Sequence, residues 1–260
     1  YFEENMMMEL RFNILSPFVD KFIICESRYS HSGKEKDIRF DKKNFPQFED
    51  KITHIIIDKE PSDIIKKDNL NTSELRLNSV LRIKEQRNFI GNSLNDYSSE
   101  DYIIHSDNDE IPNLENIDLK KINQRIILFK QNMFYYKFNL KLPNLEWYGT
   151  KGCKKKYLKS PQWLRNIKDK KYPFYRVDTY FSEKKYINLE FIDNGGWHFS
   201  NIKTAKEIEH KLKSYLHHRE FDINPMTANE IENIIINKKA IYDLTLDKTV
   251  NKIGNGNKLE

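Results

Sequence analysis

The chain has 260 residues, and its content of 38% hydrophobic and 13% aromatic residues is too high for a disordered protein. Its 44 basic and 39 acidic residues are mixed along the sequence, which argues against a nucleic-acid partner, because nucleic-acid-binding proteins concentrate their positive charge. The two cysteines, Cys25 and Cys153, support neither a disulfide framework nor a zinc site, and no apolar run reaches the roughly 18 residues of a transmembrane segment.

The first half of the chain alternates helical and strand patterns. Helical spacing of apolar residues predicts a helix over Asn5–Leu15, and apolar runs at Val19–Cys25, Ile52–Asp58 and Tyr102–His105 predict buried strands. The strongest helix is expected over Glu74–Leu94, after an N-cap and capping box in "NTSE". Its predicted apolar stripe comprises Leu77, Leu81, Ile83, Ile90 and Leu94. Strands joined by helices predict an α/β fold with a mostly parallel central sheet, in which ligands bind beyond the carboxyl ends of the strands.

The pattern changes after Pro112. Residues 125–140 predict a long aromatic strand or a hairpin, and further strands are expected at Pro173–Phe181 and Lys184–Ile192. Without an internal repeat or linker, we expect a single domain of residues 1–258. Two more helices are expected at Ala205–His218 and Ala228–Ala240, and Leu259-Glu260 is interpreted as an expression-vector remnant.

An acidic cluster follows the third predicted strand directly. In "YIIHSDNDEIP", the strand runs into Asp107, Asp109 and Glu110, whose mutual repulsion requires positive charge nearby. Asp-x-Asp at a strand end suits Mg²⁺ or Mn²⁺, which take oxygen ligands and keep positions open for phosphate oxygens. A cation held there can neutralise a diphosphate leaving group. An Asp-x-Asp triplet alone is also compatible with a solvated acidic turn that binds no metal.

Five motifs occur in order along the chain: "ESRYSHSGKEK", "EQRN", "SDNDEIP", "NGGWHFS" and "KLKSYLHHRE". Together they resemble glycosyltransferase family seventeen, a family of β-1,4-N-acetylglucosaminyltransferases, over residues 1–220. The resemblance implies a GT-A-type fold and an inverting, Mn²⁺- or Mg²⁺-dependent transfer from a nucleotide-sugar donor, most often UDP-GlcNAc. Residues 1–112 would then bind the donor, residues 113–220 a glycan or glycolipid acceptor, and residues 221–258 would form a helical extension.

On this interpretation, the metal site comprises Asp107, Asp109 and His198. Asp109 is the expected direct ligand, while Asp107 also reaches the ribose. A neutral imidazole suits Mn²⁺, and Gly195-Gly196 would allow close backbone approach to a ligand, although a structural histidine is the alternative. Glu110 is expected to orient its neighbours by hydrogen bonds.

The donor would be bound by one carboxylate and several basic side chains. Glu26 is placed to meet uridine or ribose, and a solvated strand-end carboxylate is its alternative role. Arg87 suits a diphosphate because a guanidinium bonds two oxygens at once, with a surface salt bridge as the alternative. Lys34, Lys36 and Lys211 are also expected to contact the donor, and His217 is expected to add positive charge. The alternative for Lys34 and Lys36 is that they are exposed loop lysines without a ligand.

An inverting transfer needs a general base on the acceptor side. Asp193 is the leading candidate and Glu220 the reserve, with Glu190 left open. Trp147 and the Tyr135-Tyr136 pair are candidates for an acceptor platform, although a buried core is the simpler role for the tyrosines. Trp197 either stacks on a sugar or packs in the core.

Other functions and locations stay open at this point. The lysine-rich stretch Lys151–Lys171 is interpreted as a solvated loop, with a phosphate site or a peripheral membrane contact as the alternative. Animal members of the family carry an N-terminal Golgi anchor that this sequence does not show, so we expect a cytoplasmic or peripheral membrane protein of bacterial or viral context. The alternative functions are a same-fold transferase with another nucleotide-sugar donor, and a non-catalytic protein that binds nucleic acid or glycan.

Overall fold

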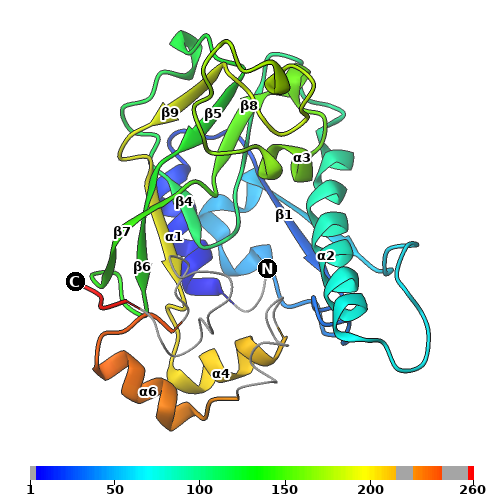
Figure 1. Ribbon diagram of the computed structural model, residues 1–260, viewed down its shortest axis with the longest axis vertical. Coiled ribbons are helices and arrows are strands. Elements are labelled where there is room, and N and C mark those ends of the chain that lie inside the picture. The colour runs from blue at the N-terminus through cyan, green and yellow to red at the C-terminus, as the bar shows by residue number, and fades with distance from the viewer. Residues whose placement is uncertain (1–3, 215–224, 242–256) are drawn as a thin grey trace.

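Short sheets and their covering helices form a mixed α/β fold in this computed structural model, which describes residues 4–214, 225–241 and 257–260 (Figure 1). The first sheet pairs β1 (Phe22–Ser27) with β2 (Ile52–Ile57) in parallel. The first expected strand therefore starts later than Val19, and the second is confirmed within one residue.

The second sheet carries the strand that precedes the acidic cluster. Its order is β3-β8-β5-β9, in which β5 and β9 run parallel and β8 is antiparallel to both of its neighbours. β8 was expected to be a solvated lysine loop, but Gly152 and Cys153 are buried between β3 and β5. The strands are β3 (Tyr102–His105), β8 (Lys151–Lys154), β5 (Ile126–Phe129) and β9 (Leu189–Ile192).

The third sheet has the order β4-β10-β6-β7. β10 runs parallel to β6 and antiparallel to β4, and β6 pairs with β7 in an antiparallel hairpin. The expected long strand or hairpin within residues 125–140 is not found, because that run contains β5 and β6, which lie in different sheets, and β7 follows it. The α/β class is confirmed, whereas the sheets are mixed in direction rather than mostly parallel. The strands are β4 (Glu110–Pro112), β10 (Gly196–Ser200), β6 (Gln131–Tyr135) and β7 (Lys141–Trp147).

The helices begin and end close to their sequence signals. The first is confirmed residue for residue, and the second begins at the predicted capping box, where Asn71 and Glu74 bond each other's backbone N–H. In Figure 1, α2 lies beside β1, and α4 and α6 lie at the end of the molecule away from β5, β8 and β9. The helices are α1 (Asn5–Leu15), α2 (Thr72–Phe89, continued by a 3₁₀ turn to Leu94), α3 (Pro161–Asn166), α4 (Ala205–Ser214) and α6 (Ala228–Ile236).

Three expectations about these elements need correction. The apolar stripe of α2 is only partly buried: Leu77 is exposed, whereas Asn78 is buried and bonds both backbone groups of Ile65. Residues 173–181 form no strand, but a 3₁₀ turn at Val177–Thr179. The last expected helix ends at Ile236, and residues 215–218 of the one before it lie outside the described residues.

The end of the chain takes part in packing. Leu259 is buried in the cluster that also contains Leu142 and Ile231, and Glu260 exchanges two backbone hydrogen bonds with Lys141, at 2.8 and 2.9 Å. The dipeptide that we set aside as a vector remnant therefore contributes to the core beside β7. In the described residues, no helix is both long and apolar enough to cross a membrane.

An aromatic cluster fixes α1 on the first sheet. Phe12 is fully buried, and its ring centroid lies 4.8 Å from that of Phe22, 5.1 Å from that of Phe45 and 5.6 Å from that of Phe48. Such edge and tilted contacts add to the hydrophobic gain of burial. The position of α1, and therefore of its polar residue Arg11, depends on this cluster.

We predict that Phe12→Ala lowers the free energy of unfolding by about 3–5 kcal/mol, because it leaves a cavity among three rings. Urea unfolding followed by circular dichroism measures the change. Phe174→Ala is the matched control, since that ring is 77% exposed and should change stability by less than about 0.5 kcal/mol. Equal losses in both variants would contradict the packing described here.

Candidate active site

The acid loop, residues Ser106 to Asp109 between β3 and β4, is held in place by α1. The guanidinium of Arg11 donates to the carbonyl of Glu110 at 2.6 Å, to the carbonyl of Asp107 at 3.3 Å and to Oγ of Ser106 at 2.6 Å. Burial lowers the pKa of Arg11 to about 10, so it stays charged at neutral pH. The helix thus fixes the backbone from which the acidic side chains project.

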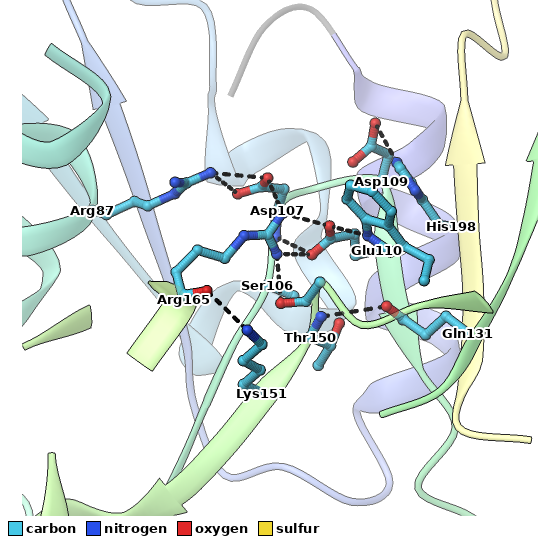
Figure 2. Close-up of polar contacts among 12 residues, drawn as sticks. Arg87, Ser106, Asp107, Asp109, Glu110, Gln131, Thr150, Lys151, Arg165 and His198 are labelled. Atoms are coloured by element: carbon cyan, nitrogen blue, oxygen red, sulfur yellow. Dashed lines mark hydrogen bonds and ion pairs between the residues drawn. The ribbon is translucent and has the colours of Figure 1, made fainter. Parts of the chain in front are cut away.

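Asp107 lies between two arginines from different helices (Figure 2). Arg87 of α2 bonds both carboxylate oxygens at 3.1 Å, and Arg165 of α3 bonds Oδ2 at 2.9 Å. Burial alone would raise the pKa of Asp107, but the two positive charges outweigh it and hold the pKa well below its usual range. Asp107 is therefore ionised and already neutralised by protein cations.

Glu110 is the most deeply buried acid of the cluster. Its carboxylate accepts two hydrogen bonds from Arg165, at 2.6 and 2.8 Å, one from Nε1 of Trp147 at 2.6 Å, and one from the backbone N–H of Asp107 at 3.0 Å. A Cβ at position 149 would lie 1.8 Å from this carboxylate, so only glycine fits at Gly149. The expectation that Glu110 orients its neighbours agrees with these contacts.

Arg165 is itself anchored from β8. The buried ammonium of Lys151 donates to the carbonyl of Arg165 at 2.9 Å and to the carbonyl of Ile167, which satisfies two acceptors at the end of α3 (Figure 2). Burial lowers the pKa of Lys151 to about 8. The strand that pairs with β3 thus also aims the arginine that neutralises the acid loop.

Asp109 faces His198 on β10. Oδ2 of Asp109 lies 3.6 Å from Nε2 of His198, and the imidazole lies against the ring of Trp147, with centroids 4.9 Å apart. Burial would lower the pKa of His198, but the charge and hydrogen bond of Asp109 outweigh this and raise it. A Cβ at Gly196 would lie 2.1 Å from the carbonyl of Ile111, so this glycine permits close approach of β10 to β4 rather than to a ligand.

These groups line one large cavity of about 1420 Å³. Single small-molecule sites usually measure about 300–1,000 Å³, so this cavity has room for two substrates. It is bounded by elements from the whole chain, including α1, β1, α2, β3, α3 and α4, and its charged lining includes Arg11, Arg87, Asp107, Asp109, Arg165 and Lys211.

Comparison with protein families matches the chain to the model of Glycosyltransferase family 17 over residues 1–250. The chain belongs to this family. It is therefore a glycosyltransferase, with a sugar donor and an acceptor as substrates. The comparisons with curated proteins and with solved structures returned no match. In a family 17 enzyme, the cavity in which these acids and arginines meet is the candidate site of the transfer chemistry.

Of the residues predicted for the donor, Arg87, Asp107, Lys36 and Lys211 line the cavity. Lys36 is ion-paired with Glu26 at 2.8 Å, and Nζ of Lys211 lies 3.6 Å from a carboxylate oxygen of Glu4. The structure thus brings three predicted cations and one predicted acid to one surface.

Two other donor predictions fall elsewhere. Glu26 is fully buried and accepts from the backbone N–H groups of Arg39 and Phe40, at 3.2 and 3.0 Å, so it anchors the loop that follows β1. Lys34 is exposed, and neither residue lines the cavity.

The residues predicted for the acceptor are scattered. Asp193 is 81% exposed, lies 3.5 Å from the ammonium of Lys130 and does not line the cavity, and Glu220 lies outside the described residues, as does His217, which was expected on the donor side. Tyr135 and Tyr136 are both buried in the core, and Tyr135 also lines the cavity. Trp197 packs against the main core and Glu190 lies in β9, and neither lines the cavity, whereas Trp147 does.

Two of the three predicted metal ligands have side chains in place to bind an ion. Among the described residues, no group of three or more His, Cys, Asp and Glu side chains is close enough to hold an ion alone. The oxygens of Asp107 are taken by arginines. Asp109 and His198 offer one oxygen and one nitrogen in the cavity, which fits Mn²⁺ or Mg²⁺ if substrate phosphates and water complete the coordination.

Two central residues were not singled out from the sequence, namely Arg11 and Arg165. The repulsion within the acid loop did indicate a positive partner, but we assigned that role to a metal ion. Arg165 lies in the short helix that begins at Ser160-Pro161. Such a helix start can be recognised in the sequence, but it does not show where the helix packs or which way Arg165 points. Only the folded chain places it opposite Asp107.

We predict that Glu110→Gln lowers the free energy of unfolding by about 3–5 kcal/mol, because it removes one of the two carboxylates that are ion-paired with the guanidinium of Arg165. Thermal unfolding measures the loss. Glu146→Gln, which changes a 55% exposed carboxylate paired with Lys130, should cost less than about 1 kcal/mol. A Glu110→Gln variant as stable as this control would contradict the network.

We also predict a pH-dependent contribution from Glu26. Burial alone would raise its pKa, but hydrogen bonds from His54, Lys36 and the backbone of Phe40 lower it from 4.5 to about 2. Because the folded pKa lies below the unfolded one, the stabilisation is present above about pH 5 and disappears as the pH falls towards 2.

Urea unfolding of the wild type and Glu26→Gln across this range tests the prediction. The variant should be less stable by about 3 kcal/mol at pH 7, and the difference should shrink steadily below pH 5. Glu35→Gln, on the exposed side of the same loop, serves as the control. A difference that does not vary with pH would show that Glu26 contributes by packing alone.

Proposed function

We propose that this family 17 enzyme transfers N-acetylglucosamine from UDP-GlcNAc, with inversion, to a hydroxyl of a glycan or glycolipid, and that it requires Mn²⁺ or Mg²⁺. The observation that carries the proposal is the pairing of Arg87, Arg165 and Asp107 beside Asp109 and His198 in one cavity. We further propose that the fold is of the GT-A type, with the acid loop at the carboxyl end of β3 as its donor site.

The charge balance of the cavity supports a need for a cation. The three acids Asp107, Asp109 and Glu110 are offset by the guanidiniums of Arg11, Arg87 and Arg165. Lys36 and Lys211 each face a carboxylate of their own. A diphosphate entering this nearly neutral surface would bring uncompensated negative charge, which a divalent cation at Asp109 and His198 would neutralise as the nucleotide leaves.

The arginines are suited to hold the diphosphate in the same place. Arg87 is only 21% exposed but lines the cavity, and its planar guanidinium can bond two phosphate oxygens as it now bonds two carboxylate oxygens. Arg165 is fixed by Asp107, Glu110 and Lys151, so it would not have to reorganise when charge develops on the leaving group.

Deprotonation of the acceptor hydroxyl needs a base within hydrogen-bond reach. Asp193 does not line the cavity, so Glu220 is the remaining predicted candidate. The indole of Trp147 also lines the cavity and would offer an apolar face to a sugar, while its N–H stays bonded to Glu110.

We predict that Asp109→Ala reduces transfer by at least a thousandfold without unfolding the protein, because it removes the carboxylate oxygen expected to hold the cation. UDP release from UDP-GlcNAc is measured with saturating Mn²⁺, together with thermal unfolding. Asp118→Ala, in an exposed turn, should keep wild-type turnover. UDP with Mn²⁺ should raise the melting temperature of the wild type and not of Asp109→Ala.

Wild-type turnover by Asp109→Ala under saturating metal would reject the metal site. A panel of nucleotide sugars tests the donor separately: release of UDP from a UDP-hexose, but not from UDP-GlcNAc, would keep the transferase and replace the sugar. Full activity in the presence of a strong chelator would reject the metal requirement while leaving the arginine contacts in place.

A further inference from the structure

An aromatic loop, residues 168–185, leaves the end of α3 and returns towards β9. Its ends are closed by a hydrogen bond from the backbone N–H of Lys168 to the carbonyl of Lys184, at 2.8 Å. Trp163 of α3 adds a second bond, from Nε1 to the carbonyl of Glu183, at 2.9 Å. In Figure 1 the loop lies at the end of the molecule opposite α4 and α6. It is therefore a closed, anchored loop on α3.

The loop turns its apolar side chains into solvent. Its internal turns are bonded, for example through the hydroxyl of Tyr180 to the carbonyl of Phe174 at 3.2 Å, so the exposure belongs to an ordered arrangement. Folded proteins seldom expose several large apolar side chains together unless that surface meets a partner. The exposed side chains are Phe174 (77%), Tyr175 (70%), Val177 (66%), Tyr180 (70%) and Phe181 (87%).

Basic residues are interspersed with these side chains along the loop. Within residues 168–185, six are basic and three are acidic, so the loop carries a positive surplus. One of the acids, Asp178, is already bonded to Arg176 and Lys185, at 2.6 and 2.7 Å. Glu183 lies 3.8 Å from Lys159, which adds a further cation at the edge of the loop. Exposed aromatic side chains together with a surplus of basic residues are the combination that binds an anionic lipid surface.

We propose that the aromatic loop docks this protein onto an anionic lipid bilayer. Phe and Tyr side chains would enter the headgroup region, while the lysines face the negatively charged lipid phosphates. A sugar-binding subsite fits less well, because no residue of the loop lines the cavity and its rings project outward instead of enclosing a space. The proposal depends on neither the donor nor the metal.

The loop also replaces the membrane contact expected from the sequence. That expectation placed the contact at Lys151–Lys171, but Lys151 is buried and Lys154 and Lys156 are both ion-paired with Glu100. The exposed basic residues Lys168, Lys170 and Lys171 belong to the aromatic loop itself.

Co-sedimentation with vesicles tests the proposal. The wild type should bind phosphatidylcholine vesicles containing 30% phosphatidylglycerol at least tenfold more tightly than pure phosphatidylcholine, and less tightly as salt rises. The double variant Phe174→Ser/Phe181→Ser should lose at least tenfold in affinity for the anionic vesicles. Ile236→Ser, which removes a 68% exposed apolar side chain from α6, is the matched control and should bind like the wild type.

A pair of charge-reversing substitutions separates the electrostatic contribution to vesicle binding from the apolar one. Lys170→Glu/Lys171→Glu should also weaken binding to the anionic vesicles about tenfold. Lys42→Glu/Lys43→Glu, on an exposed turn far from the aromatic loop in the sequence, should not. Circular dichroism and UDP release in the absence of vesicles should match the wild type for all variants. Wild type that fails to sediment with anionic vesicles would overturn the proposal. So would a dimer, seen by light scattering, that the Phe174→Ser/Phe181→Ser variant abolishes.

Discussion

The structure depends on one electrostatic constraint: three carboxylates within four residues can lie together only if positive charge offsets their repulsion, and here guanidinium groups supply it. Arg11 comes from the first helix, Arg87 from the second and Arg165 from the third, and each bonds the acid loop from a different side. The packing of these helices is therefore tied to the site. The aromatic cluster around Phe12 positions Arg11, and Lys151 on β8 positions Arg165.

This arrangement changes the meaning of the Asp-x-Asp sequence. The two aspartates look equivalent in the sequence, but Asp107 is ion-paired with arginines, whereas Asp109 faces the imidazole of His198. Two acids separated by a single residue thus have different partners, guanidinium groups for Asp107 and an imidazole for Asp109.

Local signals predicted the local structure well. The capping box of Asn71 and Glu74 marked the start of α2, and the apolar run before the acid loop is the strand β3. Pairing between distant segments could not be read in the same way. The lysine-rich segment Lys151–Lys154 pairs with β3, and its small residues Gly152 and Cys153 are buried in the sheet. The residues around this segment do not indicate which strand it pairs with.

The separation of the charged partners along the chain has a consequence for biosynthesis. Glu110 and its buried partner Arg165 are 55 residues apart, whereas Arg11 precedes both. On a ribosome, the acid loop emerges well before its main counter-ion has been made. Until then its carboxylates must stay hydrated, so this corner of the enzyme is completed late, when α3 closes over strands that already exist.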